Sequence, residues 1–529
     1  MIKIFLMFIF LAHPVSGQSP DNTGPRRDNR QGPSKEAQTF LGTFQTIRDQ
    51  SLRVIGDSAL WELAVNGLIK ELEDPYAQVF TPEQFSEFQE GNTGNYAGIG
   101  VQITNLNQMI TITAVFRGTP AERSGLLVGD LIIGVNDNNT EGWTTRMASD
   151  SIRGEIGTHV KIHIARKGLA VPLTPAIVRD SVHISPLISG IMDSGIGYIG
   201  LGRISRGSSQ EVDSVLSEFK FTHGIIMDLR GNPGGYLDES IMISDLFLKK
   251  GSRLASVESR IPGENNRDQD EAWEALLPDR IPNKPVIVLV DDFSASASEI
   301  IAGALQDHDR ALIIGRPTFG KGVFQKIFRL NSGRHLRLTT GEWFTPLGRS
   351  LNRSWTKQGL PAREDPDTFP VLTTKSGRNL VSGGRIFPDL NISSDTLTLI
   401  ERSFLSQAAR DSVPITLRIE EFAFTQADAL RSAGEQPNVD PVQFSSFIDN
   451  LIEEGIEEKY ANNQEILDYI KWRVSARLAE RMGWIGRSVE ILSQRDLVLA
   501  EAVRILNDFH NMPDIFSAVK LIADAEAKN

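Results

Sequence analysis

The stretch that most constrains the fold is a run of serines and alanines between an apolar strand and a helix. Residues 285–290, Pro-Val-Ile-Val-Leu-Val, are apolar and mostly β-branched, which predicts a buried strand. Residues 292–299 follow with the sequence Asp-Phe-Ser-Ala-Ser-Ala-Ser-Glu. Beyond them, apolar residues recur at helical spacing from Ala297 to Leu305. The serines are therefore predicted to lie at a strand-to-helix turn.

A serine at such a turn has two interpretations. The first N–H groups of a helix are unpaired and its dipole favours negative charge, so a serine hydroxyl there could attack a carbonyl while those groups stabilise the oxyanion. Alternatively, Ser294 or Ser296 only caps the helix. Three alternating serines between alanines favour the first interpretation, because small residues let a substrate backbone approach closely.

A second motif follows another apolar run, residues 311–315. Residues 318–325 read Thr-Phe-Gly-Lys-Gly-Val-Phe-Gln, and the lysine is Lys321. A lysine flanked by glycines between apolar strands is poorly placed for solvation. Burial lowers the pKa of a lysine, and the neutral amine can then act as a general base. Gln325, four residues further on, is a candidate for orienting that amine.

Taken together, the two motifs and their spacing resemble the carboxy-terminal processing (tail-specific) serine peptidases. Those enzymes use a Ser–Lys dyad, commonly assisted by a glutamine. The resemblance implies that Ser296 is the nucleophile, Lys321 the general base and Gln325 the residue that orients Lys321. It also implies an α/β core related to crotonase-like folds and a reaction that needs no metal or organic cofactor.

The sequence Asp-Leu-Arg-Gly-Asn-Pro-Gly-Gly, which ends at Gly235, resembles the loop with which these peptidases supply a backbone N–H to the oxyanion hole. Glycine suits that role because no Cβ blocks the reacting carbonyl. We assign the hole to the N–H of Ala297 and to that of Gly234 or Gly235, and the residues leave this choice open. Asp228 and Arg230 are predicted to form a structural ion pair or turn contacts.

The region 92–180 resembles a PDZ domain. It opens with the stretch Gly98, Ile99, Gly100 and Val101, and an Ala-Glu-Arg-Ser-Gly-Leu run and a Gly-Asp pair before an apolar strand follow. A glycine loop that enters a strand exposes N–H groups to a carboxylate, and the strand edge accepts an extended peptide. The resemblance implies that this domain binds the C-terminal tail of a substrate protein.

Arg153 is the remaining candidate for substrate binding. It matches the position at which related peptidases carry an arginine that links the PDZ domain to the active site. The alternative is an ordinary surface arginine, and the sequence does not favour either.

The N-terminus has the layout of a secretory signal peptide. Lys3 precedes an apolar run at 4–12, and small residues at 15–17 offer a cleavage site. The run is too short to span a bilayer comfortably, although an uncleaved N-terminal anchor is the alternative. We expect an exported protein, periplasmic or extracellular, that is soluble or loosely associated with a membrane.

The expected fold class is a multidomain α/β protein in which a mostly β PDZ domain is inserted between an N-terminal helical element and the peptidase core. Within the core, residues 251–283 are predicted to form an irregular excursion beside the site. In the C-terminal region we expect one strand at 413–424 and then helices that cap the core or form a dimer. The predicted divisions are a signal peptide (1–17), a disordered linker (18–38), the N-terminal helical region (39–91), the PDZ domain (92–180), the Ser–Lys peptidase core (181–395) and a mainly helical C-terminal region (396–529).

Composition excludes several other classes. The formal net charge of −12 argues against a nucleic-acid partner. The chain has no cysteine, so disulfides, thiolate metal sites and cysteine nucleophiles are excluded. The eight histidines form no His-Glu-x-x-His motif and there is no Gly-x-Ser-x-Gly, so zinc-peptidase and α/β-hydrolase interpretations lack support.

Two functions from different classes remain. The first is an exported serine endopeptidase that recognises protein substrates by their C-terminal tail and cleaves them through an acyl-enzyme. The second is a catalytically idle PDZ scaffold that binds protein C-termini. The presence of Ser296, Lys321 and Gln325 favours the enzyme. Its expected partners are proteins or peptides with a free C-terminus. A second copy bound through the N- or C-terminal helices and an adaptor protein are further candidates.

Overall fold

The structure of the chain is a computed structural model. It describes residues 34–93, 95–106, 108–116, 118–166, 168–260, 267–330, 333–354, 356, 362, 365–393 and 397–526. The predicted signal peptide and most of the predicted linker lie outside the described residues. The chain divides into two compact units, Met1–Leu72 and Glu73–Asn529, which are treated separately below.

The first unit contains two helices, α1 (Lys35–Gln50) and α2 (Asp57–Glu71). The side chain of Ser34 caps α1 by accepting a hydrogen bond from the N–H of Ala37 at 3.2 Å. Phe44 stacks on Trp61 with ring centroids 3.9 Å apart. The prediction of a linker as far as residue 38 is therefore wrong at its end, because the serine cap starts the helix at Lys35.

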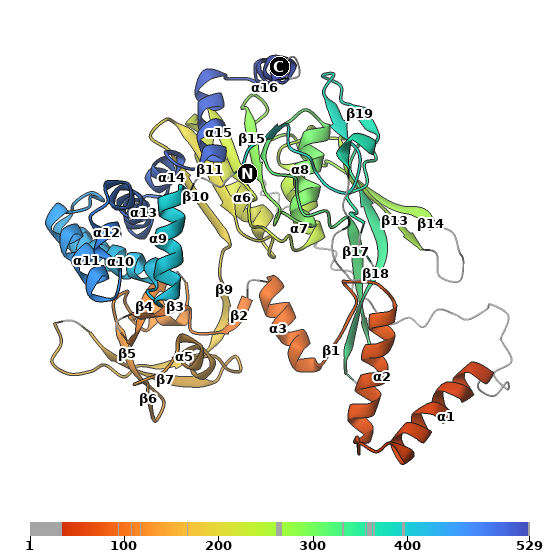
Figure 1. The fold of residues 1–529 in the computed structure, drawn as a ribbon, viewed down its shortest axis with the longest axis horizontal. Coiled ribbons are helices and arrows are strands. Elements are labelled where there is room, and N and C mark those ends of the chain that lie inside the picture. The colour runs from red at the N-terminus through yellow and green to blue at the C-terminus, as the bar shows by residue number, and fades with distance from the viewer. Residues whose placement is uncertain are drawn as a thin grey trace, which may run out of the picture. The chain divides into compact units, whose positions relative to one another are not determined.

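The region of the second unit that was predicted to be the peptidase core is built on a six-stranded sheet (Figure 1). Its five consecutive strands from β11 to β21 are parallel and β10 is antiparallel to β11. In spatial order the strands are β10 (Leu187–Ile191), β11 (Ile196–Leu201), β12 (Gly224–Asp228), β15 (Val286–Val290), β16 (Leu312–Gly315) and β21 (Leu390–Asn391).

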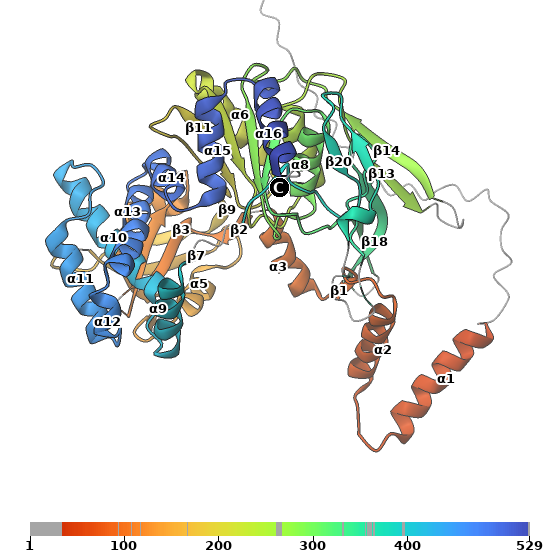
Figure 2. The ribbon, with the colours of Figure 1, turned by 45° about the horizontal axis from the view of Figure 1, so that its top comes forward.

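Helices cover both faces of this sheet (Figures 1 and 2). Along β15, Val286, Val288 and Val290 face one cluster of buried side chains, whereas Ile287 and Leu289 face the other. The first cluster includes residues of α6 (Ser208–Glu218), α7 (Leu237–Asp245) and α8 (Ala297–Asp307). The second includes residues of α14 (Ile485–Ser493), α15 (Leu497–Asp508) and α16 (Met512–Glu526). C-terminal helices thus cap the core, as the sequence predicted.

A second sheet lies beside the first, with β18 paired to β1, β13 and β17. The strands are β1 (Gln78–Phe80), β13 (Arg253–Arg260), β14 (Arg267–Glu274), β17 (Val323–Arg329) and β18 (His335–Phe344). The irregular excursion predicted at 251–283 is wrong, because β13 and β14 form an antiparallel pair there. Three apolar residues of this segment pack into the core: Leu254, Ala255 and Val257. The strands were not predicted because most of the segment is polar.

The PDZ domain has a hydrophobic core of its own, to which Ile99, Ile112 and Ile162 belong. The short strands β2 (Asn95–Gly98) and β9 (Asp180–His183) pair outside its sheet. Its elements are β3 (Val101–Leu106), β4 (Met109–Val115), α4 (Pro120–Arg123), β5 (Leu131–Val135), β6 (Asn138–Asn139), α5 (Thr145–Ile152), β7 (His159–Ala165) and β8 (Ala176–Val178). Helix α3 (Pro82–Thr93) precedes the domain, and Thr81 caps it by accepting from the N–H of Gln84 at 3.2 Å.

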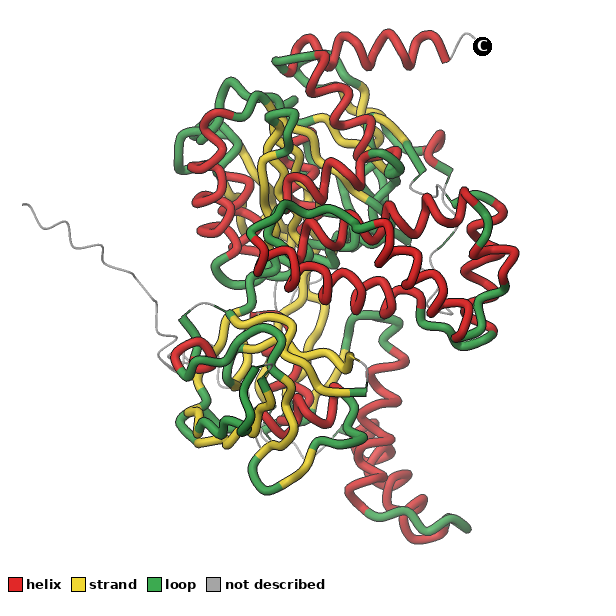
Figure 3. Tube along the Cα trace, turned by 90° about the vertical axis from the view of Figure 1, so that its left-hand side faces the viewer, coloured by secondary structure: helices red, strands yellow, loops and turns green. Residues whose placement is uncertain are grey.

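The rest of the C-terminal region packs around a separate cluster of apolar side chains, and Figure 3 shows its helices in red. These helices are α9 (Leu399–Arg410), α10 (Ile415–Ala433), α11 (Pro441–Glu453), α12 (Glu458–Ala461) and α13 (Gln464–Arg481). The strand predicted at 413–424 is wrong because α10 occupies it. Ile415, Ile419, Ala423 and Ala427 are buried at a spacing of one helical turn. Within the described part of the chain, no helix has the length and apolar character needed to span a membrane.

Candidate active site

Ser296 lies between the end of β15 and the first residue of α8, as the sequence predicted. Its backbone has φ +56° and ψ −115°. A positive φ is strained for a residue with a side chain, and such strain persists only where surrounding contacts enforce it. The next residue, Ala297, begins the helix, so its N–H points out of the positive end of the helix dipole.

The other two serines of the motif have structural roles. The hydroxyl of Ser294 donates to the carbonyl of Leu229 at 2.8 Å, and that of Ser298 donates to the carbonyl of Asn232 at 3.1 Å. Both side chains are fully buried. They bind the serine turn to the loop that follows β12, whereas Ser296 lines a cavity.

Glu299 is the functional residue that the sequence analysis did not assign. Its fully buried carboxylate accepts hydrogen bonds from four donors. They are the N–H of Ser296 (2.7 Å), the hydroxyl of Thr318 (2.5 Å), the N–H of Gly320 (2.8 Å) and the N–H of Lys321 (2.9 Å). Burial raises the pKa of Glu299, and the donors oppose that rise. One carboxylate thus holds the serine turn against the loop that carries Lys321. The Ser-x-x-Glu spacing of a capping box was the available signal.

The environment of Lys321 suits a proton acceptor. Burial lowers its pKa from 10.5 to about 8, and the nearby charge of Arg337 adds to this effect. The charges of Glu299 and Asp74 act in the opposite direction. The Lys321 nitrogen lies 4.9 Å from the ring centroid of Tyr76. A neutral amine is therefore accessible close to physiological pH.

Gln325 lies on β17 and lines the same cavity as Ser296 and Lys321. Its amide nitrogen donates to the carbonyl of Val323 at 3.2 Å. The orientation of Lys321 by Gln325 stays a prediction.

The loop after β12 distinguishes the two glycines that the sequence left as alternatives. The N–H of Gly234 donates to the side-chain oxygen of Asn232 at 2.9 Å and is therefore occupied. Neither Gly235 nor Ala297 has an acceptor for its N–H among the residues that the structure describes. A side chain at Gly235 would meet the carbonyl of Ile204 at 1.8 Å, so only glycine fits there. The geometry favours Gly235 with Ala297 as the oxyanion donors.

These groups converge on a cavity of about 580 Å³. Polar groups of the candidate machinery share its wall with aromatic and aliphatic side chains, as is usual for a site that takes an extended organic ligand. The lining includes Gly234, Gly235, Ser296, Ala297, Lys321, Gln325, Phe85, Phe88, Ile300, Val323, Phe324 and Trp343. In the described part of the chain, no three His, Asp or Glu side chains cluster as metal ligands. The absence of a cofactor stays a prediction.

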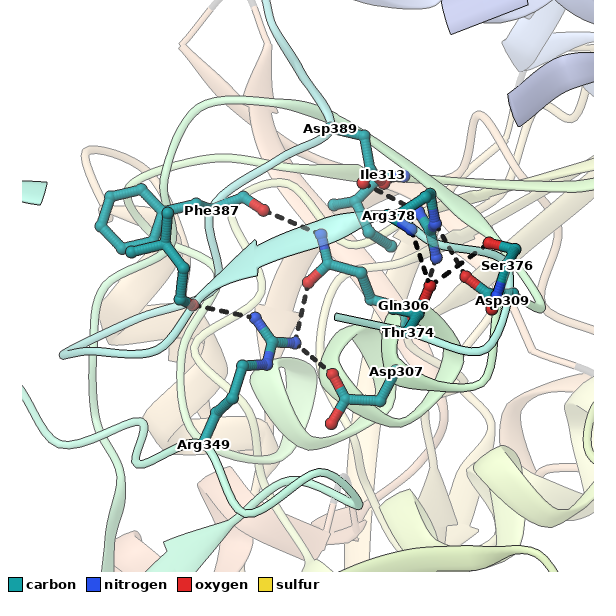
Figure 4. A network of polar contacts seen from close by, with 11 residues as sticks. Gln306, Asp307, Asp309, Ile313, Arg349, Thr374, Ser376, Arg378, Phe387 and Asp389 are labelled. Atoms are coloured by element: carbon teal, nitrogen blue, oxygen red, sulfur yellow. Dashed lines mark hydrogen bonds and ion pairs between the residues drawn. The ribbon is translucent and has the colours of Figure 1, made fainter. Parts of the chain in front are cut away.

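The opposite end of α8 is fixed by a buried polar network (Figure 4). Arg349 donates to Asp307 at 2.6 Å and to the side chain of Gln306 at 2.8 Å. Arg378 donates to Asp309 and to Asp389, both at 2.8 Å. The helix is therefore held at both ends, which limits rotation of the N–H groups at its N-terminus.

In the PDZ domain, the backbone of the glycine stretch is tied to neighbouring segments. The carbonyl of Ile99 accepts from the N–H of Ala121 at 2.7 Å, and that of Gly100 accepts from the N–H of Phe116 at 3.0 Å. Ile99 is fully buried in the domain core, and Val101 begins β3. The stretch is a turn that enters a strand, and its binding of a carboxylate stays a prediction.

Tyr96, on β2 just before this stretch, is a further residue that the sequence analysis missed. A side chain at Gly98 would lie 2.5 Å from the Tyr96 ring, so the ring covers that glycine. The guanidinium carbon of Arg153 lies 4.7 Å from the centroid of the same ring. Burial raises the pKa of Tyr96, whereas the charge of Arg153 and hydrogen bonds from the N–H groups of Gly100 and Val101 lower it.

Comparison with known proteins supports the same division of the chain. The model of peptidase family S41 matches residues 195–359, and the PDZ domain model matches residues 87–165. The carboxy-terminal-processing protease of Bartonella bacilliformis is 34% identical over 332 residues, covering 61% of this chain and 74% of that protein. The carboxy-terminal processing protease CtpA of Bacillus subtilis is 31% identical over 379 residues, covering 70% and 78%.

Among solved structures, the photosystem II D1 C-terminal processing protease is 23% identical, with a TM-score of 0.34 and coverage of 62% of this chain and 87% of that one. The helix-covered sheet, the serine turn and the PDZ domain define the class, which is a serine-type peptidase. The chain belongs to peptidase family S41, among the carboxy-terminal processing proteases. This membership favours the enzyme over the idle scaffold.

Proposed function

We propose that this protein is an exported endopeptidase that cleaves proteins selected by their C-terminal tail, with Ser296 and Lys321 as a catalytic dyad. The observation that carries the proposal is the position of Glu299. Its carboxylate bonds to the N–H of Ser296 at 2.7 Å and to that of Lys321 at 2.9 Å. Two segments that are distant in the sequence are thereby held at one cavity.

In the proposed mechanism, neutral Lys321 takes the proton of the Ser296 hydroxyl as its oxygen attacks the substrate carbonyl. The N–H groups of Ala297 and Gly235 stabilise the oxyanion. Lys321 then gives the proton to the leaving amine, which leaves an acyl-enzyme. Lys321 next activates a water molecule, whose attack releases the acid and restores the Ser296 hydroxyl. Gln325 orients the amine of Lys321 from β17.

The PDZ domain selects the substrate in this proposal. The tail carboxylate binds to the N–H groups of the stretch Gly98, Ile99, Gly100 and Val101, and the chain of the tail adds to the edge of β3. Arg153 contributes through its contact with Tyr96. Binding at this stretch displaces the Tyr96 hydroxyl from the N–H groups of Gly100 and Val101.

The direct test replaces Ser296 by alanine and measures cleavage of a denatured protein. We expect activity to fall by a factor of at least about a thousand, because the nucleophile is removed. Ser217→Ala is the matched control, since Ser217 belongs to a Ser-x-x-Lys sequence on α6, is exposed, and its hydroxyl donates to the carbonyl of Asp213. Full activity in purified Ser296→Ala would overturn the dyad.

Tail selection has its own test. The same peptide substrate is offered with a free or an amidated C-terminus, and products are identified by mass spectrometry. Free-tail substrate should be cleaved faster, because an amide lacks the carboxylate that the loop binds. Equal rates for the two forms would contradict recognition through this loop.

Export is proposed from the sequence of residues 1–17, which lie outside the described residues. Sequencing the N-terminus of the protein recovered from the periplasm or the medium tests it. The expected new N-terminus is Gln18 or a neighbouring residue, and an intact Met1 on cytoplasmic protein would contradict export.

A homodimer is the partner that the first unit supports. Phe40, Leu63 and Leu68 are large apolar side chains on α1 and α2, and more than half of the surface of each is exposed. Apolar side chains exposed together on a surface are typical of association sites. The molar mass in solution, compared with that of Leu68→Asp, tests the dimer. The adaptor protein considered above stays a prediction.

A further inference from the structure

Arg230 connects the loop after β12 to the C-terminal helical region. Its guanidinium pairs with Asp228 through Nε at 2.9 Å and Nη2 at 2.7 Å. Its Nη1 donates to Asp496 at 2.7 Å. The side chains of Arg230 and Asp228 are largely buried, and that of Asp496 is 23% exposed. The predicted ion pair of Asp228 and Arg230 is thus confirmed, and a second carboxylate from a distant segment completes it.

Asp496 has two separate functions in this arrangement. One oxygen caps α15 by accepting from the N–H of Leu499 at 3.1 Å, and the other binds Arg230. Helix α15 packs against the sheet that carries the active site (Figure 2). A capped helix on that sheet is a rigid support, so Asp496 is a second fixed anchor for Arg230, in addition to Asp228.

From Arg230 the connection continues to the serine turn. The carbonyl of the preceding residue, Leu229, accepts from the hydroxyl of Ser294 at 2.8 Å. Two residues after Arg230, the carbonyl of Asn232 accepts from the N–H of Ala295 at 3.0 Å. The side chain of Asn232 then accepts from the N–H of Gly234. These bonds link the loop of Arg230 to the serine turn and to the peptide that carries the N–H of Gly235.

We propose that Asp496 is a positioning residue for the oxyanion loop and acts through Arg230. The helical C-terminal region thereby takes part in catalysis by the peptidase core. This inference rests on the proposed function, since it requires Gly235 to stabilise the oxyanion formed at Ser296. Loss of Asp496 leaves Arg230 paired with Asp228, so its effect is confined to the geometry of the loop and does not leave an unpaired buried charge.

The test uses Asp496→Asn in the full-length protein. Asparagine keeps an oxygen to cap α15 but removes the charge that binds Arg230. We expect kcat to fall about tenfold with KM unchanged, because a misplaced donor affects the transition state more than binding. Phosphonylation of Ser296 by a fluorophosphonate probe should slow by the same factor, since it uses the same donors. Asp496→Ser should show the same losses as Asp496→Asn, because serine also caps α15 but its side chain cannot reach Arg230.

The matched control is Asp508→Asn at the other end of α15, where Asp508 pairs with Arg504 on the surface. It should keep the kcat of the unmodified protein. A kcat for Asp496→Asn and Asp496→Ser equal to that of the control would overturn the proposal, as would a loss explained by a lower folded fraction in thermal unfolding. If Ser296→Ala is inactive while both Asp496 variants are fully active, only the positioning role fails and the dyad stands.

Discussion

In the peptidase core the serine turn is held by a buried carboxylate, whereas in the PDZ domain the loop from Gly98 to Val101 is held by its own backbone and an aromatic ring. Glu299 accepts four hydrogen bonds from two segments of the core. The PDZ loop is shaped by glycines, and Tyr96 covers one of them. Substitutions in the core should therefore act through lost charge and unpaired donors. Those in the PDZ loop should act through steric fit.

Among tests of this contrast, the largest expected effect is that of Glu299→Gln. A neutral amide cannot accept from all four donors, and each buried donor left unpaired costs about 1–3 kcal/mol. We expect kcat to fall about a hundredfold and the thermal unfolding midpoint to decrease, with tail binding unchanged. Glu218→Gln on the exposed end of α6 is the control. Full activity of Glu299→Gln would mean that the serine turn does not depend on the buried carboxylate, and its contrast with the PDZ loop would be lost.

The second-largest expected effect on activity is its pH dependence. Burial lowers the pKa of Lys321 from 10.5 to about 8, and only the neutral amine accepts a proton. Because deprotonation increases with pH, kcat/KM should rise about tenfold between pH 7 and pH 9, with a midpoint of about 8. Tail binding to inactive Ser296→Ala should not follow that rise. A midpoint near 10.5 would mean that Lys321 is solvated during catalysis.

Gly100→Ala tests the steric character of the PDZ loop. Gly100 has φ +89°, and an added Cβ would lie 2.3 Å from the Cβ of Thr119. We expect the affinity for a C-terminal peptide, measured by fluorescence anisotropy, to fall several-fold, because the clash with Thr119 adds to the cost of about 1–2 kcal/mol for an alanine at positive φ. Cleavage of an amidated peptide should not change.

Gly168→Ala is the matched control for that experiment, since Gly168 also has φ +89° but has open space where the Cβ would lie. A smaller effect at Gly168 separates the clash with Thr119 from backbone strain. Equal losses at both positions would show that strain alone is responsible.

The smallest expected effect is that of Tyr96→Phe. If a tail carboxylate binds as proposed, it competes with the phenol oxygen for the N–H groups of Gly100 and Val101, which lower the pKa of Tyr96. Removal of that oxygen should strengthen binding of a free-tail peptide about two- to threefold, since one modest hydrogen bond no longer has to be broken. Isothermal titration with free and amidated peptides measures this. Weaker binding by Tyr96→Phe would mean that the hydroxyl contacts the tail itself.

Local patterns predicted most of the architecture. The apolar, β-branched run of β15 and the helical spacing after Ser296 depend only on neighbouring residues, and both predictions were confirmed. The prediction of a strand at 413–424 was wrong because β-branched and aromatic residues that suit a strand also fit the buried face of α10. The pair of β13 and β14 was missed because β13 is stabilised by pairing with β18, which lies far away in the chain.

The sequence by itself determined the two motifs, the PDZ domain and the family, because these depend on residue types at short, fixed spacing. The tertiary structure decided which donors and acceptors meet. In the fold, Glu299 accepts from the N–H of Lys321, and Asp496 pairs with Arg230. The N–H of Gly234, rather than that of Gly235, donates to Asn232. The physical reason is that hydrogen bonds and ion pairs act over a few ångströms, and the chain fold alone sets which distant residues come that close.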